Sequence, residues 1–563
     1  MNTKIILKLG ILCLACALMA SCYDDQDGND FDSTMPNVLI TIPESAYSGS
    51  LGQAITIEPV VSTTIDESDL EYIWEVKGAR YNDQERQFFV PMVDDELQQR
   101  TLNYVCHLDS NITSLNYSYE CRLRVHQKTT GRDFYSTSPF TLTIQGVTGL
   151  MVLYDCGNGS DIGVLEADEF MPEASSLPDE PKAVAGMYSM NAGRPLDGKG
   201  LSIVQIYPPD IEWFGDDMKN RCRIFVMTES QAFWLERNDL SIYGDWESEF
   251  YLQDSRKVNA GQPKGVVFQG DELYTFDGDN LFIRQPAYTP QFLFPMYTPE
   301  TECVGGHTFV FSPGAAIELN PYGGMQDMLY ASSVDGTSQK GFVALTQNPM
   351  YGGPDNTVLL DTQDDPVPFN PADMHADLLK MRYDSRGHVV AVMKGDGSHP
   401  VFGSNCFLAD IFTDAETAGN STYQGFPQCV CDMSLLTDID RAIAFDFGST
   451  QNMMYYATAS NVYRYGLDDK TLSAAQTLCM TDGSSIIFDG EITMMKMLDS
   501  PNVERHDSDE ILLVATYDGS QSRLYALHIE PMTGNVDFMS EYSADNVGGW
   551  EFGRIYDVNI KAM

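Results

Sequence analysis

Apolar residues in this chain come in short runs that alternate with polar residues, which is typical of β-strands. Between residues 37 and 146, runs such as 70–76 and 119–125 alternate with period two and are separated by turn residues. Strands at this spacing predict a β-sandwich, and a span of about 110 residues suits one immunoglobulin-like domain. We expect Trp74 to lie in the core between the two sheets.

A second pattern recurs from residue 147 to residue 563: an apolar run, a turn with Gly, Asp or Asn, and another apolar run. Seven copies are found, about 50 to 70 residues apart, which is near the period of propeller repeats. The first copy begins with 151–154, and the paired runs of the others are 223–227 with 232–235, 272–276 with 280–283, 328–331 with 341–345, 388–392 with 405–408, 453–457 with 461–465, and 511–515 with 522–527.

A sheet this small buries both faces only by stacking against neighbouring sheets. We therefore predict an all-β chain in which residues 147–563 form a β-propeller, with seven blades favoured and six or eight as alternatives. The competing interpretation is two or three further β-sandwiches. The unit spacing argues against it, because one sandwich needs about 90 to 100 residues.

The first 36 residues follow neither pattern. Lys4 and Lys8 precede an apolar run over 5–18, and small residues stand just before Cys22. The run is shorter than the roughly 20 residues that span a bilayer. This pattern predicts a lipoprotein signal peptide over 1–21, a lipidated Cys22 and an acidic tether over 22–36. A soluble secreted protein with a chance cysteine at the cleavage point is the alternative.

Charge and cysteine content narrow the candidate partners. The chain has 34 basic and 81 acidic residues, a net charge of −47, so we expect it to bind neither nucleic acid nor anionic lipid headgroups. Its 12 cysteines are scattered and do not form a disulfide framework. Cys106 and Cys121 stand in strand-like runs and could pair if those strands adjoin.

Motifs that carry reactions are absent from the sequence, including GxSxG, HExxH and the phosphate-binding loops. We therefore expect no catalytic residue, no cofactor and no metal. Four aspartates of the repeat region follow or end strands, where propeller glycosidases place acid–base carboxylates, although aspartate is also a common turn residue. They are Asp155, Asp277, Asp384 and Asp518.

Three tryptophans stand in loop-like segments rich in Gly and Asp. We take Trp213, Trp246 and Trp550 as candidate ligand-binding residues, because an exposed indole can stack on a sugar ring. The alternative for each is packing beneath its own loop.

Several segments occur in an order that resembles the PKD-like lipoprotein family of Bacteroidetes. They are Cys-Tyr-Asp-Asp at 22–25, Tyr-Ile-Trp at 72–74, the run 119–125, Thr-Gly at 130–131 with Tyr135, and the junction 149–153 followed by 157–161. The resemblance covers the chain up to about residue 170. It implies an N-terminal PKD/Ig-like domain. The acidic segment behind Cys22 also resembles the export signal that sends such lipoproteins to the outer face of the outer membrane.

The resemblance further implies that the protein accompanies a TonB-dependent porin and its partner lipoprotein in the outer membrane. We therefore expect a lipid-anchored, cell-surface, non-enzymatic component of a nutrient uptake system that binds a glycan or a protein or peptide. The alternatives are a propeller-type glycoside hydrolase or lyase acting on a surface polymer, and a structural subunit of an outer-membrane complex.

Overall fold

The structure is a computed structural model. It describes residues 37–77, 88–92, 98–107, 109, 111–112, 117–171, 180–206, 223–237, 240–245, 265–269, 272–276, 281–284, 295–297, 309–310, 317–318, 326–331, 333–334, 337–348, 353–359, 369–383, 388–414, 424–448, 452–467, 475–499 and 510–561. These residues form mainly strands, so the prediction of an all-β chain is confirmed. The helical elements among them are short: η2 (Glu67–Asp69), η4 (Asp168–Phe170), α2 (Met187–Ala192), η9 (Met433–Leu435) and η10 (Ile439–Arg441).

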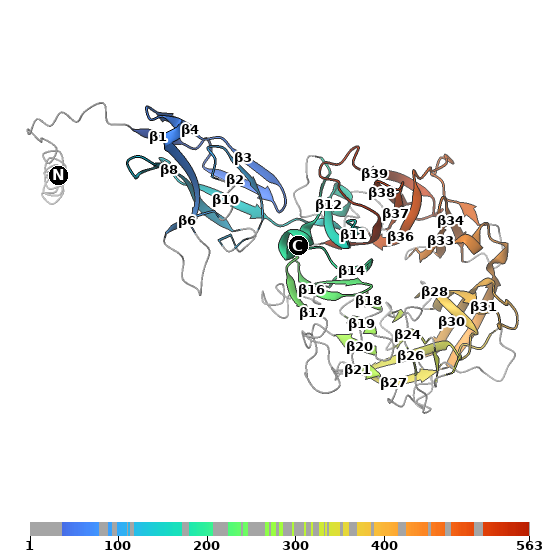
Figure 1. Cartoon of the computed structure of the whole chain (residues 1–563). Helices are drawn as coiled ribbons and strands as arrows, with labels where there is room; N and C mark the ends of the chain where they lie inside the picture. Colours follow the sequence, from blue (N-terminus) through green and yellow to red (C-terminus); the bar gives the residue numbers. More distant parts are fainter. Residues whose placement is uncertain are drawn as a thin grey trace, which may run out of the picture.

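The N-terminal part is a β-sandwich (Figure 1). Its strands are β1 (Val38–Thr41), β2 (Ala46–Ser50), β3 (Ala54–Ile57), β4 (Val60–Thr63), β5 (Leu70–Lys77), β6 (Phe89–Pro91), β7 (Leu102–Val105), β8 (Ser118–Gln127), β9 (Arg132–Tyr135) and β10 (Phe140–Gln145). One sheet has the order β2-β10-β8-β5-β6, with β9 also paired to β8, and the other strands pair as β1-β4 and β3-β7. Their buried faces share one apolar core.

Trp74 of β5 lies in this core, as predicted. Its side chain is 2% exposed, its indole N–H donates to the Gln99 carbonyl at 2.9 Å, and its ring meets Phe140 edge-on. Cys106 and Cys121 are buried free thiols, so the disulfide that their strand-like context allowed is not formed. The core of the sandwich is therefore held by packing.

Seven four-stranded antiparallel sheets follow among the described residues, numbered here 1 to 7. Sheet 1 has β11 (Gly149–Asp155), β12 (Ser160–Glu166), β13 (Lys182–Val184) and β40 (Ile555–Lys561), and sheet 2 has β14 (Gly200–Ile206), β15 (Arg223–Thr228), β16 (Ala232–Glu236) and β17 (Ile242–Asp245). Sheet 3 has β18 (Gly265–Gln269), β19 (Glu272–Phe276), β20 (Leu281–Arg284) and β21 (Pro295–Tyr297), and sheet 4 has β23 (Ile317–Glu318), β24 (Gln326–Ala331), β26 (Gly341–Asn348) and β27 (Gly353–Leu359).

The last three sheets have the same plan. Sheet 5 has β28 (Ala376–Tyr383), β29 (His388–Gly395), β30 (Cys406–Asp414) and β31 (Gln424–Asp432), and sheet 6 has β32 (Ala444–Phe447), β33 (Met453–Ala457), β34 (Val462–Gly466) and β35 (Gln476–Thr477). Sheet 7 has β36 (Glu491–Asp499), β37 (Glu510–Tyr517), β38 (Ser522–Ile529) and β39 (Val536–Tyr542), and a separate short pair joins β22 (Phe309–Val310) to β25 (Ser333–Val334). In sheets 2 to 7 the paired runs predicted from the repeat coincide with the two middle strands.

The C-terminal strand β40 belongs to the first sheet, where it pairs with β11 over Gly149–Tyr154. One edge strand of several sheets also contacts an edge strand of a neighbouring sheet: β40 contacts β14 and β36, β14 contacts β18, and β32 contacts β28 and β36. We call these edge strands the leading strands of their sheets. Figure 1 shows the sheets succeeding one another around a common centre, with the red sheet 7 next to the teal sheet 1. The two ends of this region of the chain are therefore joined within one sheet.

An aspartate of β40 ties this strand to the leading strands on both sides. The carboxylate of Asp557 lies 2.7 Å from the Lys496 ammonium of β36 and accepts the backbone N–H of Ile203 in β14 at 2.9 Å. A partly buried ion pair with a further backbone donor satisfies the carboxylate well. One side chain thus links sheets 7, 1 and 2.

The same arrangement recurs at Asp446 of β32. Its carboxylate lies 3.0 Å from the Lys380 ammonium of β28 and accepts the backbone N–H of Met497 in β36 at 2.8 Å. Sheets 5, 6 and 7 are therefore joined in the way that sheets 7, 1 and 2 are joined.

A buried polar cluster holds η4 of the sheet 1 region against sheet 7. The carboxylate of Glu169 is paired with His528 Nε2 of β38 and accepts the hydroxyl of Tyr542 of β39. The Glu169 and His528 side chains are each 2% exposed. Buried polar groups of this kind are stabilising only while all members remain paired.

Replacing Glu169 should therefore be costly. We expect Glu169→Leu to lower the free energy of unfolding by about 3 kcal/mol, because it leaves two buried polar side chains without their acceptor. Urea denaturation followed by tryptophan fluorescence measures the change. The exposed Glu180 is the matched control, and Glu180→Leu should change stability by less than about 0.5 kcal/mol. Equal effects of the two substitutions would contradict a stabilising role for the cluster.

The sandwich packs directly on sheet 1. Leu51, at the end of the sandwich, and Val184 of β13 belong to one continuous apolar cluster. Between them, Gly52 has φ +80°, and a Cβ there would lie 2.5 Å from a Val184 methyl group. Lys182 of β13 also donates to the Ser50 hydroxyl at 3.3 Å. The close approach needs glycine at position 52 both for its backbone conformation and for its lack of a side chain.

Candidate functional site

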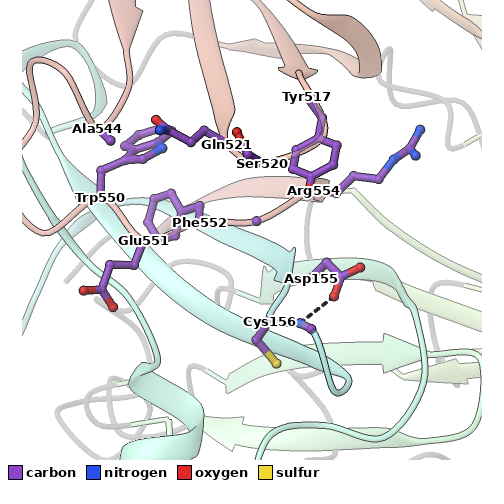
Figure 2. Close-up of a pocket in the computed structure, with 12 residues that line it drawn as sticks. Asp155, Cys156, Tyr517, Ser520, Gln521, Ala544, Trp550, Glu551, Phe552 and Arg554 are labelled. Atoms are coloured by element: carbon purple, nitrogen blue, oxygen red, sulfur yellow. Dashed lines mark hydrogen bonds between the residues drawn. The ribbon is translucent and has the colours of Figure 1, made fainter.

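A cavity of about 510 Å³ lies where sheet 1 meets sheet 7 (Figure 2). Three segments line it: the turn after β11 at 155–157, the turn between β37 and β38 at 517 and 520–521, and the connection from β39 to β40 at 544 and 550–554. The first segment and the last two are more than 350 residues apart in the sequence. They meet because β40 returns to sheet 1 and contacts β36 of sheet 7.

Two of the aspartates singled out from the sequence shape the turns around this cavity. Asp518 accepts the backbone N–H groups of Gln521 and Ser520, each at 2.8 Å, and these bonds lower the pKa of its carboxyl to about 2. Asp155 accepts the N–H of Gly157 at 2.7 Å. The turn role is therefore confirmed for both. Asp277 and Asp384 lie outside the described residues.

The same turn position carries threonine in two other sheets. The hydroxyl of Thr228 accepts the N–H of Gln231 at 3.0 Å in sheet 2, and the hydroxyl of Thr458 accepts the N–H of Asn461 at 3.1 Å in sheet 6. The Thr228, Thr458 and Asp518 side chains thus each accept the backbone N–H group three residues later in their turns.

Asp155 is also held by a second donor. Its other carboxylate oxygen accepts the hydroxyl of Tyr556 in β40 at 3.0 Å. Burial, together with this bond, raises the pKa of Tyr556 to about 12. One oxygen of Asp155 therefore holds the turn after β11, and the other links β11 to β40. Next to it, burial raises the pKa of the Cys156 thiol, which disfavours the nucleophilic thiolate at neutral pH.

Trp550 forms part of the cavity lining, although most of the residue is buried. Its side chain is 6% exposed, its indole N–H donates to the Ser522 carbonyl at 3.1 Å, and its ring packs on Phe552 at 4.7 Å between centroids. Ligand binding by Trp550 stays a prediction. Trp213, Trp246 and Cys22 lie outside the described residues.

Four other lining residues extend the candidate site beyond those predicted. Tyr517 donates its hydroxyl to the Gly519 carbonyl at 3.0 Å, which holds its ring at the cavity. Arg554 is 43% exposed and lies 3.9 Å from the nearest carboxylate, that of Glu491. Glu551 and Gln521 are exposed. The sequence signal that could have found them is their closeness to Trp550 and Asp518 in the chain.

The arrangement offers aromatic surface beside a cation, a carboxylate and an amide. In Figure 2, Glu551 and Arg554 extend toward opposite sides of the group, with Phe552 and Tyr517 between them. Across the residues that the structure describes, no three His, Cys, Asp or Glu side chains come close enough together to hold a metal ion. In the same part of the chain, none of the helices is long and apolar enough to cross a membrane.

Comparison with known proteins gives one family. The PKD-like family matches residues 22–200, about a third of the chain. The matched segment begins at Cys22, covers the sandwich, and continues through β11, β12, β13 and α2. It therefore includes the turn at 155–157 that lines the cavity. No curated protein matches the chain.

Proposed function

We propose that this protein is a lipoprotein of the Bacteroidetes type, anchored in the outer membrane through Cys22 and exposed at the cell surface, where it binds a nutrient polymer without transforming it. The observation that carries the proposal is the cavity between sheets 1 and 7. Its lining combines aromatic surface with solvent-accessible polar side chains, as ligand sites do. Asp155, a candidate acid–base carboxylate, has both of its oxygens bonded, to Gly157 and to Tyr556, which supports binding without catalysis.

The proposed attachment is supported by two separate observations. The signal pattern over 1–21 predicts Cys22 as the first residue of the mature chain. The match to the PKD-like family begins at the same residue. A TonB-dependent porin and its partner lipoprotein are the proposed companions.

The seven-sheet region is proposed to be a seven-bladed β-propeller. Three features support this architecture: seven four-stranded antiparallel sheets in chain order, contacts between their leading strands, and the completion of sheet 1 by β40. Further β-sandwiches would instead require pairs of sheets packed face to face. The cavity would then open where the last blade meets the first.

Two measurements on cells test the proposed function. We expect an antibody against the sandwich to label intact cells, and we expect the affinity-tagged protein to retain a polymer from the growth substrate and to recover the porin with it. A protein that is hidden from antibody on intact cells would overturn the surface assignment. Turnover of the retained polymer by the purified protein would overturn the non-enzymatic role.

A further inference from the structure

We infer that the cavity between sheets 1 and 7 binds a neutral oligosaccharide, with Tyr517 as the stacking surface and Arg554, Gln521 and Glu551 as hydrogen-bonding groups. The inference rests on the proposed binding function and names the ligand class for that site. It also assigns the functional face of the seven-sheet region. That face carries the turns after β11 and β37.

The aromatic contribution comes mainly from Tyr517. Trp550 and Phe552 pack on each other and are 6% and 3% exposed, so they form the floor of the cavity. Tyr517 is only partly buried, and its hydroxyl is fixed by the Gly519 carbonyl. A tyrosine ring that is already oriented loses little conformational entropy when a ligand covers it. The C–H face of a sugar ring is the apolar surface that fits it.

The polar contribution comes from side chains that the fold does not use. Within the described residues, the side chains of Gln521 and Glu551 make no hydrogen bond, and Arg554 has a 3.9 Å approach to Glu491 and an electrostatic interaction with Tyr556. Together they supply N–H donors, carboxylate acceptors and an amide that does both. Sugar hydroxyl groups donate and accept, so they match this mixed set.

The distribution of charge favours a neutral and extended ligand. Glu551 and Arg554 lie toward opposite sides of the group, so one positive and one negative group flank the aromatic surface (Figure 2). An acidic polymer would meet Glu551 and the field of a chain with a net charge of −47. An apolar ligand would leave the three polar side chains desolvated and unpaired.

A peptide fits the site less well than a saccharide. Extended peptides commonly bind by adding a strand to an unpaired sheet edge. β11 and β37 have no such edge, because β11 lies between β12 and β40 and β37 lies between β36 and β38. β40 is at the edge of sheet 1, but it packs against β14 and β36. The cavity lining comes from turns and a connecting segment instead.

The decisive experiment measures binding and thermal unfolding together. A soluble form that lacks the signal peptide and Cys22, residues 23–563, would be titrated with neutral gluco-, xylo- and mannohexaose, with an oligogalacturonate of equal length, and with a casein digest as the peptide probe. We expect at least one neutral hexasaccharide to bind and to raise the melting temperature, because the site joins sheet 1 to sheet 7. Arg554→Ala and Tyr517→Ala should each weaken that binding by about tenfold or more.

Arg441→Ala is the matched control. Arg441 is 75% exposed and lies in η10, between sheets 5 and 6, and its loss should leave binding unchanged. Failure of all three neutral hexasaccharides to bind overturns the inference, as does neutral-sugar binding that survives both cavity substitutions. Binding of only the peptide or the acidic probe also overturns it, while the proposed surface-binding function then stands. Loss of surface labelling on intact cells would instead contradict the proposed function alone.

Discussion

Deletion of residues 555–563 is expected to abolish cooperative folding of the seven-sheet region. Without β40, the edge of β11 loses its partner over Gly149–Tyr154. The buried side chains of Ile555 and Val558 are also lost, and each contributes about 1.5–3 kcal/mol through burial alone. The ladder hydrogen bonds and the contacts of Asp557 add to this, so the total is comparable with the 5–15 kcal/mol that stabilises a typical protein. Circular dichroism melts and limited proteolysis measure the loss.

A graded control separates the strand from its ion pair. Asp557→Asn keeps β40 and should lower stability by about 1–2 kcal/mol, because it weakens the link to Lys496 and Ile203 while preserving the pairing with β11. A deletion variant with an unchanged melt and unchanged proteolysis would show that β40 does not close this region.

Substitution of Cys22 by alanine is expected to move the protein from the membrane fraction to the soluble fraction. Two or more acyl chains anchor a protein stably, and in this reading of the signal they are carried by Cys22 alone. Cell fractionation followed by immunoblotting measures the distribution, and metabolic labelling with a fatty acid should label only the protein that retains Cys22. Nearly all of the protein should change fraction, since no partial anchor is expected to remain.

The control for this variant is another cysteine. Cys13→Ala changes the apolar part of the signal peptide and should leave both labelling and membrane attachment intact. Continued membrane attachment of Cys22→Ala, with no fatty-acid label, would contradict lipidation as the anchor. Partner proteins would then have to hold it.

The middle strands of the sheets could be predicted because their signal is local. The run at 511–515 and its partner at 522–527 are apolar, lie close in the sequence and enclose a turn, and they became β37 and β38. Trp74 could likewise be placed in a core from the alternation around it. Buried strands and tight turns leave such traces in consecutive residues.

Features that depend on distant pairing could not be predicted in this way. The partner of β40 is β11, more than 390 residues earlier, and the sequence of neither strand indicates which strand it pairs with. The pairing of Glu169 with His528 and Tyr542 has the same origin. The cavity follows from these pairings, which explains why the sequence singles out Trp550 and Asp155 but not Tyr517 and Arg554.

The close contact between the sandwich and sheet 1 has a mechanical consequence. Because Gly52 lies against Val184 with no space for a side chain, the sandwich and sheet 1 should move together as one rigid body. In the proposed attachment, the 15 residues of 22–36 would set the largest possible distance between Cys22 and the sandwich, about 50 Å for a fully extended chain of this length. The length of the segment 22–36 would therefore set the distance from the membrane at which a polymer is bound. Shortening this segment would reduce that distance without changing the cavity.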